Sequence, residues 1–160
     1  MDLQALEEIR QLKFRYFRSL DTREWETFAD CLAEDVVARY GTKAMGEPLH
    51  FDSRQDVVDY MSANMGPGLI SVHVANHPEI TVDGETASGT WAFEDTVIAT
   101  DFGMLIRGAG YYNDTYRRDA DGAWRIASTA YERIYEAMTS LADTPSFKLI
   151  ANRFDPELAH

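Results

Sequence analysis

The sequence predicts one α+β domain, in which three helices lie against a strongly curved antiparallel sheet. Residues 1–68 contain three segments with the apolar spacing of helices, whereas four runs rich in β-branched and aromatic residues follow from residue 69. Asp83-Gly84 and Asp121-Gly122 are hairpin signals between those runs, so consecutive strands should pair antiparallel. Helices followed by a meander are typical of the α+β class.

Each of the three helices is predicted from an apolar stripe and a start signal. The first stripe repeats at three- and four-residue spacings: Leu3, Leu6, Ile9, Leu12, Tyr16, Phe17 and Leu20. Asp21-Thr22-Arg23-Glu24 has the pattern of a capping box and predicts the start of a second helix, with Trp25, Phe28, Ala29 and Leu32 on its inner face. Ser53-Arg54-Gln55-Asp56 predicts the cap of a third helix, which carries Val57, Val58, Met61 and Met65 and ends at Gly66-Pro67-Gly68.

The strands are predicted at 35–40, 69–82, 86–100, 104–118 and 123–137. Asp101-Phe102-Gly103 supplies a looser turn between the third and fourth of these runs. From Thr139 onward the helical pattern is weak and two prolines interrupt it. We therefore expect one domain over 1–138 and an extension over 139–160, which packs on that domain or on a neighbouring subunit.

Composition excludes several classes of function. The chain has 160 residues and a formal net charge of −12, with scattered basic residues, which argues against nucleic acid and anionic membrane surfaces as partners. No apolar run approaches the roughly 20 residues of a membrane span, and the acidic start lacks the features of a secretory signal. Cys31 is the one cysteine, so no internal disulfide forms, and we expect a cytoplasmic protein.

Two polar residues on the first helical stretch are candidates for chemistry. Tyr16 places a phenol on an apolar stripe, where its hydroxyl needs a partner that a core carbonyl or a substrate oxygen could supply. Asp21 is explained by helix capping alone, but its carboxylate could instead orient a histidine and stabilise the imidazolium. The pattern leaves both alternatives open.

His73 and His77 lie at alternating positions of one strand and would share a face if that strand were regular. The spacing could suit a metal. However, no cysteine joins them, and catalytic zinc sites usually take a third protein ligand, so we expect no metal. His77 also precedes Pro78, where the ladder should break, and it could simply bond locally.

Asp95 continues the series Trp91, Phe93, Asp95 and Val97 on the face expected to be buried. A buried carboxyl must be hydrogen-bonded, neutralised by a raised pKa, or exposed to a pocket. A regular hairpin with its turn at Asp83-Gly84 would leave Asp95 and His73 on opposite faces. We therefore predict a one-residue bulge at Asn76-His77-Pro78, which reverses the parity of the strand.

Several stretches together resemble the SnoaL-like branch of the NTF2-like superfamily, and most closely its bile acid 7α-dehydratase type. They are IRQLKFRYFRSLD from Ile9, ISVHVANHPEI from Ile70, GTWAFED from Gly89 and YYNDTYRRDADGAWRIASTAYERIY from Tyr111. The resemblance covers about residues 8–138. It implies a cone-shaped α+β barrel around a deep apolar pocket, usually in a homotrimer.

The resemblance also implies catalytic positions at Tyr16, Asp21, His73 and Asp95. His73 would be the general base, with Asp21 holding its ring, while Tyr16 would donate to the substrate oxygen. Asp95, if burial keeps it protonated, would donate to the same oxygen or assist the departing hydroxyl, and these two roles are interchangeable. Phe17, Trp91 and Phe93 are expected as pocket walls or core. Arg133, on the last predicted strand, is left out of the catalytic set, because a charged strand residue is usually solvated.

These residues lead to the hypothesis of a dehydratase, a lyase without cofactor or metal that removes water from an apolar, steroid-like ring compound. A ketosteroid isomerase-type enzyme, a dehydrochlorinase and a noncatalytic binding or accessory subunit are the alternatives. The related dehydrochlorinases carry an arginine where this sequence has Thr129, which weakens the haloalkane alternative. Scytalone dehydratase relatives favour dehydration without identifying the substrate.

Overall fold

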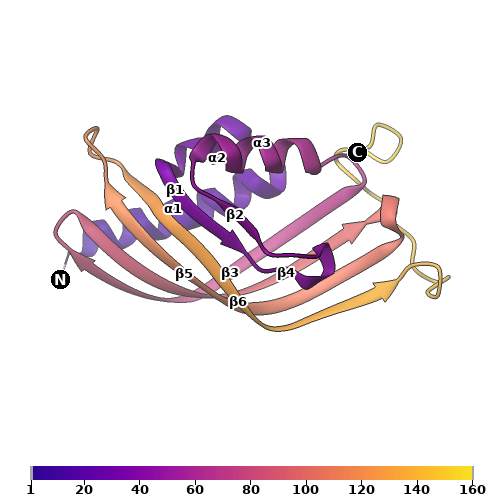
Figure 1. Ribbon diagram of the computed structural model, residues 1–160. Coiled ribbons are helices and arrows are strands. Elements are labelled where there is room, and N and C mark those ends of the chain that lie inside the picture. Colours follow the sequence, from indigo (N-terminus) through magenta and orange to yellow (C-terminus); the bar gives the residue numbers. More distant parts are fainter. Residues whose placement is uncertain (1, 160) are drawn as a thin grey trace.

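The computed structural model describes residues 2–159 and shows helices on one side of a single curved sheet (Figure 1). The helices are α1 (Leu3–Thr22), α2 (Trp25–Asp30) and α3 (Arg54–Asn64), and two short 3-10 turns, η1 (Lys43–Met45) and η2 (Thr100–Phe102), lie between strands. The strands are β1 (Leu32–Tyr40), β2 (Leu49–Phe51), β3 (Leu69–Asp83), β4 (Thr86–Ala99), β5 (Met104–Arg118) and β6 (Trp124–Ser140). The predicted α+β class and the three helices are confirmed.

The sheet has the strand order β2-β1-β6-β5-β4-β3 and stays open at both edges. Its four long strands form the predicted antiparallel meander and curve beneath the helices (Figure 1). The pairing of β1 with β6 is parallel, however, and β2 extends the edge beyond β1. The expectation of a wholly antiparallel sheet is therefore wrong at this edge. A three-residue strand such as β2 is too short to leave a periodic pattern in the sequence.

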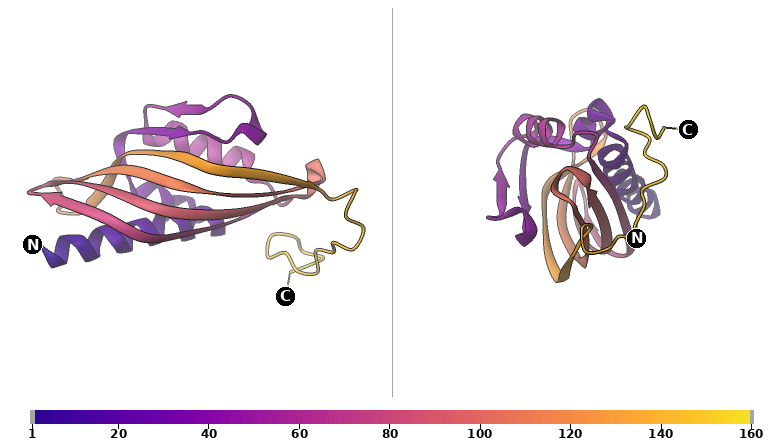
Figure 2. Two further views of the ribbon diagram at one scale, coloured as in Figure 1. Left: turned by 90° about the horizontal axis from the view of Figure 1, so that it is seen from below. Right: turned by 90° about the vertical axis from the view of Figure 1, so that its right-hand side faces the viewer.

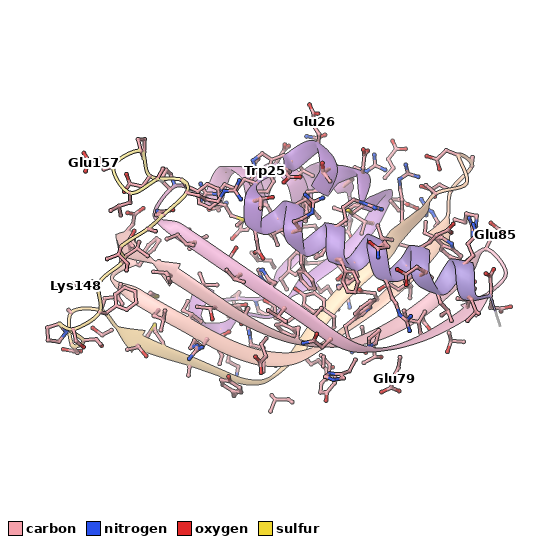
Figure 3. The ribbon with its side chains drawn as sticks, turned by 180° about the vertical axis from the view of Figure 1, so that it is seen from behind. Trp25, Glu26, Glu79, Glu85, Lys148 and Glu157 are labelled. Carbon is pink, nitrogen blue, oxygen red and sulfur yellow. The ribbon has the colours of Figure 1, made fainter. Side chains whose placement is uncertain are left out.

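The predicted stripe of the first helix forms much of the core. Ile9, Leu12, Tyr16 and Leu20 are buried against the concave face of the sheet, and α1 crosses beside β3 (Figure 3). Leu3, at the start of the stripe, is 70% exposed. Asp2 caps the helix by accepting a hydrogen bond from the Ala5 backbone N–H at 3.0 Å.

The predicted start of the second helix is wrong. Asp21 lies in the last turn of α1, and Arg23 ends that helix with a left-handed φ of 61°. The helix α2 begins at Trp25, and the side chain of its N-cap residue, Glu24, makes no capping hydrogen bond. Leu32, expected on this helix, begins β1 instead. By contrast, Ser53 caps α3 as expected, accepting from the Asp56 N–H at 3.1 Å.

The predicted bulge in β3 is confirmed. Asn76 pairs with Ala92 and Glu79 pairs with Thr90, so His77 and Pro78 together oppose a single residue of β4. His77 adopts a left-handed φ of 50°. The hairpin turn consists of Gly84 and Glu85, one position later than expected, but the parity argument holds because the bulge brings His73 directly opposite Asp95.

Beyond β6 the chain returns to its own domain along the helix side (Figure 2). The Leu141 N–H donates to the Gly103 carbonyl at 2.8 Å, and the Asn152 side chain donates to the Pro67 carbonyl at 3.1 Å. The Arg23 guanidinium lies 3.5 Å from the centre of the Phe154 ring. The strand itself continues to Ser140, two residues past the predicted boundary at 138.

None of the helices in residues 2–159 is long and apolar enough to cross a bilayer.

Candidate active site

A cavity of about 400 Å³ lies between the concave face of the sheet, α3 and the segment that joins β1 to β2. This volume is in the range of small-molecule sites. Strand register orders its sheet wall into cross-strand rows. The first row consists of Leu69, Ala99 and Met104. Another row, two inward-facing positions further along the strands, consists of His73, Asp95, Gly108 and Glu136.

His73 and Asp21 form a close pair at the wall of this cavity. One Asp21 carboxylate oxygen lies 2.7 Å from His73 Nδ1 and accepts the Ser71 hydroxyl at 2.8 Å, and the other accepts the His73 backbone N–H at 2.8 Å. The Phe17 ring stacks on the imidazole, with 5.2 Å between the ring centres and an angle of 8° between the ring planes. With Nδ1–H assigned as the donor to Asp21, Nε2 is the nitrogen that takes a proton.

The structure shows why Asp21 lies where it does. A carboxylate in the last turn of α1 is poorly placed with respect to the helix dipole, and the helix end gives it no backbone donor of its own. Its three hydrogen bonds come instead from β3, from Ser71 and His73. Asp21 therefore joins α1 to β3 and fixes the orientation of the imidazole.

Tyr16 lines the cavity together with a second tyrosine. Its hydroxyl lies 2.8 Å from that of Tyr40, a residue the sequence analysis did not single out. Burial raises the pKa of Tyr16 well above its ordinary value, and burial also raises the pKa of Tyr40, although the hydrogen bond from Tyr16 acts in the opposite direction. Both phenols therefore remain neutral donors around neutral pH. Tyr112 and Tyr131 add two further phenols to this end of the cavity.

Asp95 is buried, as expected, and of the three arrangements open to a buried carboxyl the structure shows hydrogen bonding. Arg133 donates to both of its oxygens, from Nη1 at 2.9 Å and from Nη2 at 2.7 Å. This bidentate pair compensates the charge of the carboxylate. Burial alone would lower the pKa of Arg133, but the hydrogen bonds and charge of Asp95 outweigh it, so the pKa is raised and the guanidinium stays charged.

The expectation that Arg133 is solvated is also wrong, because only 10% of its side chain is exposed. Its Nε lies 2.8 Å from Glu136 Oε2, an ion pair without the alignment of a hydrogen bond, and its Nη2 lies 3.3 Å from the Thr42 hydroxyl. Arg133, Tyr131 and Thr129 alternate on one face of β6. The cavity thus receives an arginine from the last strand after all, four residues after the buried Thr129.

Gly108 gives Arg133 its place. It stands between Asp95 and Glu136 in the same row, and a Cβ there would overlap Nη1 of Arg133 and crowd the Asp95 carboxylate. This row of acid, glycine and acid holds the guanidinium flat against the sheet. Alternation along the sequence alone misses Arg133, because the register of β6 shifts by one residue between Ile126 and Ser128, which turns Arg133 to the inner face.

Other candidates lie away from the cavity. Trp91 and Phe93 are core residues, and Phe17 lies behind His73, so none of the three is among the described residues that line the cavity. His77 is exposed at the bulge and does not join His73. Within residues 2–159, no three histidine, cysteine or acidic side chains gather as a metal site would require.

A buried ion pair lies beyond the tyrosines, and the sequence analysis missed it. Lys13 Nζ is 2.7 Å from Asp114 Oδ2, and both side chains are 0% exposed. The ammonium lies 3.9 Å from the Tyr112 ring centre and 4.7 Å from that of Phe17. Asp114 also accepts the Tyr116 hydroxyl at 2.8 Å. Burial lowers the pKa of Lys13, while the charge of Asp114 acts in the opposite direction.

The sequence profile of the SnoaL-like domain matches residues 1–130. A candidate scytalone dehydratase from Novosphingobium aromaticivorans is 18% identical, with a TM-score of 0.74 over 85% of this chain and 88% of that one. A type 2 hexachlorocyclohexane dehydrochlorinase (LinA) is 16% identical, with a TM-score of 0.72 over 86% and 90%. The LinA-type3 enzyme from Novosphingobium barchaimii is 15% identical, with a TM-score of 0.73 over 86% and 91%. At these identities the three structures establish a shared fold.

Proposed function

The chain belongs to the SnoaL-like domain family, and from that premise we propose that it is a dehydratase, a lyase that needs no cofactor to remove water from an apolar, steroid-like ring compound. The observation that carries the proposal is the Asp21–His73 pair at the wall of the cavity, with 2.7 Å between Oδ1 and Nδ1. The resemblance of Ile9–Asp21 and Ile70–Ile80 to bile acid 7α-dehydratases supports the substrate class.

In the proposed reaction, His73 Nε2 takes a carbon-bound proton next to the substrate carbonyl. Asp21 stabilises the imidazolium that forms, because its carboxylate already accepts from Nδ1. The electron pair of the broken C–H bond moves toward the carbonyl, whose oxygen accepts a hydrogen bond from the Tyr16–Tyr40 pair. The enolate then expels the hydroxyl group, which receives the proton from His73 and leaves as water.

In this scheme Arg133 takes over the role first expected of Asp95. Asp95 holds the guanidinium through two hydrogen bonds, and Arg133 lines the cavity. In the proposed pose the departing hydroxyl accepts a hydrogen bond from the second Nη1–H of Arg133, and it leaves as neutral water after His73 has protonated it. Asp95 is thus a positioning residue, and Arg133 assists the C–O bond that breaks.

The first experiment is a mass-spectrometric screen of the purified protein with hydroxylated 3-oxo steroids. Loss of water that requires His73, tested with His73→Ala, is the expected result. His77→Ala is the matched control, because this exposed histidine lies four residues further along the same strand. An unchanged mass with a moved double bond would make the enzyme an isomerase, loss of chloride from haloalkanes alone would make it a dehydrochlorinase, and no turnover would favour a binding subunit.

Replacing Asp21 tests the proposed dyad more finely. Asp21→Asn removes the charge that stabilises the imidazolium, so kcat should fall by about 10²- to 10⁴-fold with little change in KM. Ser71→Ala removes a neighbouring hydrogen bond to the same carboxylate without removing the charge. It should lower kcat by no more than roughly tenfold. Equal losses in the two variants would contradict the role given to Asp21.

We also propose that the protein works in the cytoplasm as a homo-oligomer, a trimer in preference to a dimer. Apolar side chains on the convex face of the sheet support association, because Val72, Val74, Tyr111 and Tyr135 are each about half exposed. Sedimentation equilibrium of the purified protein should give three times the 18.1 kDa chain mass. A monomer across micromolar concentrations would contradict it.

A further inference from the structure

The cavity changes in character along its length. The two rows at the start of β3 and β5 carry apolar side chains, and the apolar lining continues on α3. These residues are Leu69, Ala99, Met104, Val97 and Ile106 on the sheet and Met61 and Met65 beside α3. Every charged or titratable group of the sheet wall lies in the next rows. Four of the five tyrosines that line the cavity, Tyr16, Tyr40, Tyr112 and Tyr131, lie at this end, and Tyr60 lines the cavity from α3. A ligand that fills the cavity therefore has one hydrocarbon end and one oxygenated end, and the oxygenated end faces His73 and the tyrosines.

The charges at this polar end do not favour an anion. Arg133 is the one cation among the described residues that line the cavity. Its guanidinium is already bound by Asp95 through both Nη atoms and by Glu136 beside Nε. One positive charge thus stands against two carboxylates, and Asp21 behind His73 adds a third. Glu47, in the segment between η1 and β2, is a further acid on the lining.

Neutral oxygen groups, in contrast, find matching partners. The Tyr16–Tyr40 pair offers a phenol donor to a ketone or hydroxyl oxygen, and His73 Nε2 accepts from a hydroxyl. A carboxylate at the same place would lose its hydration next to carboxylates, with no free cation to replace the water. A neutral ligand and a carboxylate of the same shape therefore differ in binding free energy mainly through the cost of removing water from the charged group.

We propose that the Asp95–Arg133–Glu136 cluster is a charge filter, which admits uncharged ketones, hydroxyls and amides to the polar end of the cavity and rejects carboxylates there. This inference rests on the proposed function, because it takes the same cavity as the substrate site. It narrows the substrate to a ring compound whose buried end is neutral. Arg133 is thereby assigned to the enzyme's own carboxylates rather than to an acidic substrate.

The test compares two isosteric probes by isothermal titration calorimetry at pH 7.5. 2-Naphthamide and 2-naphthoate differ in charge while sharing ring system and shape. The amide should bind the full-length protein at least about tenfold more tightly than the acid, because an unpaired carboxylate must be desolvated. Binding of the acid as tight as that of the amide would overturn the proposal. So would failure of both to bind, since the filter requires that the neutral probe enters.

Two variants identify the cluster as the cause. Asp95→Asn removes one carboxylate from Arg133, and Glu136→Gln removes the other. Each variant should lower the ratio of the dissociation constants of the acid and the amide severalfold. Glu94→Gln is the matched control, because Glu94 precedes Asp95 on β4 but is exposed on the opposite face. A ratio that stays the same in both cluster variants, or that falls equally in Glu94→Gln, would overturn the proposal.

These measurements separate the filter from the proposed reaction, because they record binding and need no turnover. A protein that binds naphthamide selectively but dehydrates no steroid would retain the charge filter and lose the lyase function. A protein that dehydrates a steroid yet binds the two probes equally would retain the lyase function and lose the filter.

Discussion

Two charged side chains of the candidate site, Arg133 and Asp21, take their positions because a neighbouring residue has no side chain or because the local backbone has no free donor. Gly108 contributes no side chain, and for that reason the Arg133 guanidinium can lie between Asp95 and Glu136. Asp21 lacks backbone donors at the end of α1 and takes them from β3. In both cases the charged group is fixed by contacts with another element, across strands for Arg133 and between α1 and β3 for Asp21.

Gly108→Ala should therefore disturb Arg133 directly. The added methyl group would overlap the guanidinium and crowd Asp95, so the free energy of unfolding should fall by about 1–3 kcal/mol. Chemical denaturation measures this change. Gly66→Ala is the matched control, because a Cβ there meets nothing within 4 Å. Equal stabilities for the two variants would show that the ion pair adapts without cost.

At the scale of elements, irregular backbone decides which side chains face the cavity. The bulge in β3 makes Ser71, His73 and Ala75 point inward on one side of it and Ile80 and Val82 on the other. His77 absorbs the irregularity with its left-handed φ of 50°. Such a conformation is uncommon outside glycine, although histidine tolerates it better than β-branched residues do.

Substitutions at His77 should follow backbone preference. His77→Gly should leave stability unchanged or raise it by up to about 1 kcal/mol, whereas His77→Val should lower it by roughly 1–2 kcal/mol, because a β-branched residue resists positive φ. Thermal unfolding of the two variants gives the order. A valine variant as stable as the glycine variant would mean that the bulge has moved.

The ion pair between α1 and β5 joins two elements in the core. Lys13→Met leaves the Asp114 carboxylate buried without its partner, so the variant should lose about 3–5 kcal/mol of stability. The double variant Lys13→Met with Asp114→Asn removes both charges and should recover much of that loss. A double-mutant cycle by denaturant unfolding measures the coupling, and additive losses would contradict it.

At the scale of the whole molecule, buried phenols couple the fold to pH. Burial raises the pKa of Tyr16, Tyr40, Tyr112 and Tyr116 above the ordinary value of 10.0. Above that pH the unfolded chain loses protons that the folded protein keeps, so stability falls as the pH rises. Burial lowers the pKa of Lys13 below its ordinary value of 10.5, so just below that pH this residue taken alone makes stability rise with pH.

We therefore expect the free energy of unfolding to decline steeply above pH 10. Each of these tyrosines contributes up to about 1.4 kcal/mol per pH unit. Urea unfolding between pH 8 and pH 11 measures the slope. Tyr116→Phe should make the slope shallower, and a flat profile to pH 11 would contradict the assignment.

The fold class, the three helices and the β3 bulge could be predicted because each leaves a local pattern. The pairing partners could not. Tyr40 lies 24 residues from Tyr16, and Arg133 lies 38 residues from Asp95, so each pair comes together only when the helix packs on the sheet or the strands pair. The false capping box at Asp21 shows the same limit, because a contact with β3 decides the role of a residue whose neighbours along the chain suggest another.

The bulge at His77 has a consequence for the gene. Loss of the single codon for His77 would leave the register of β3 intact, because one residue of the bulge has no partner of its own on β4. Asn76 would still pair with Ala92 and Glu79 with Thr90, so Ser71 and His73 would still face the cavity. A deletion of one codon at this place would therefore make the strand regular without changing the chemistry of the pocket wall.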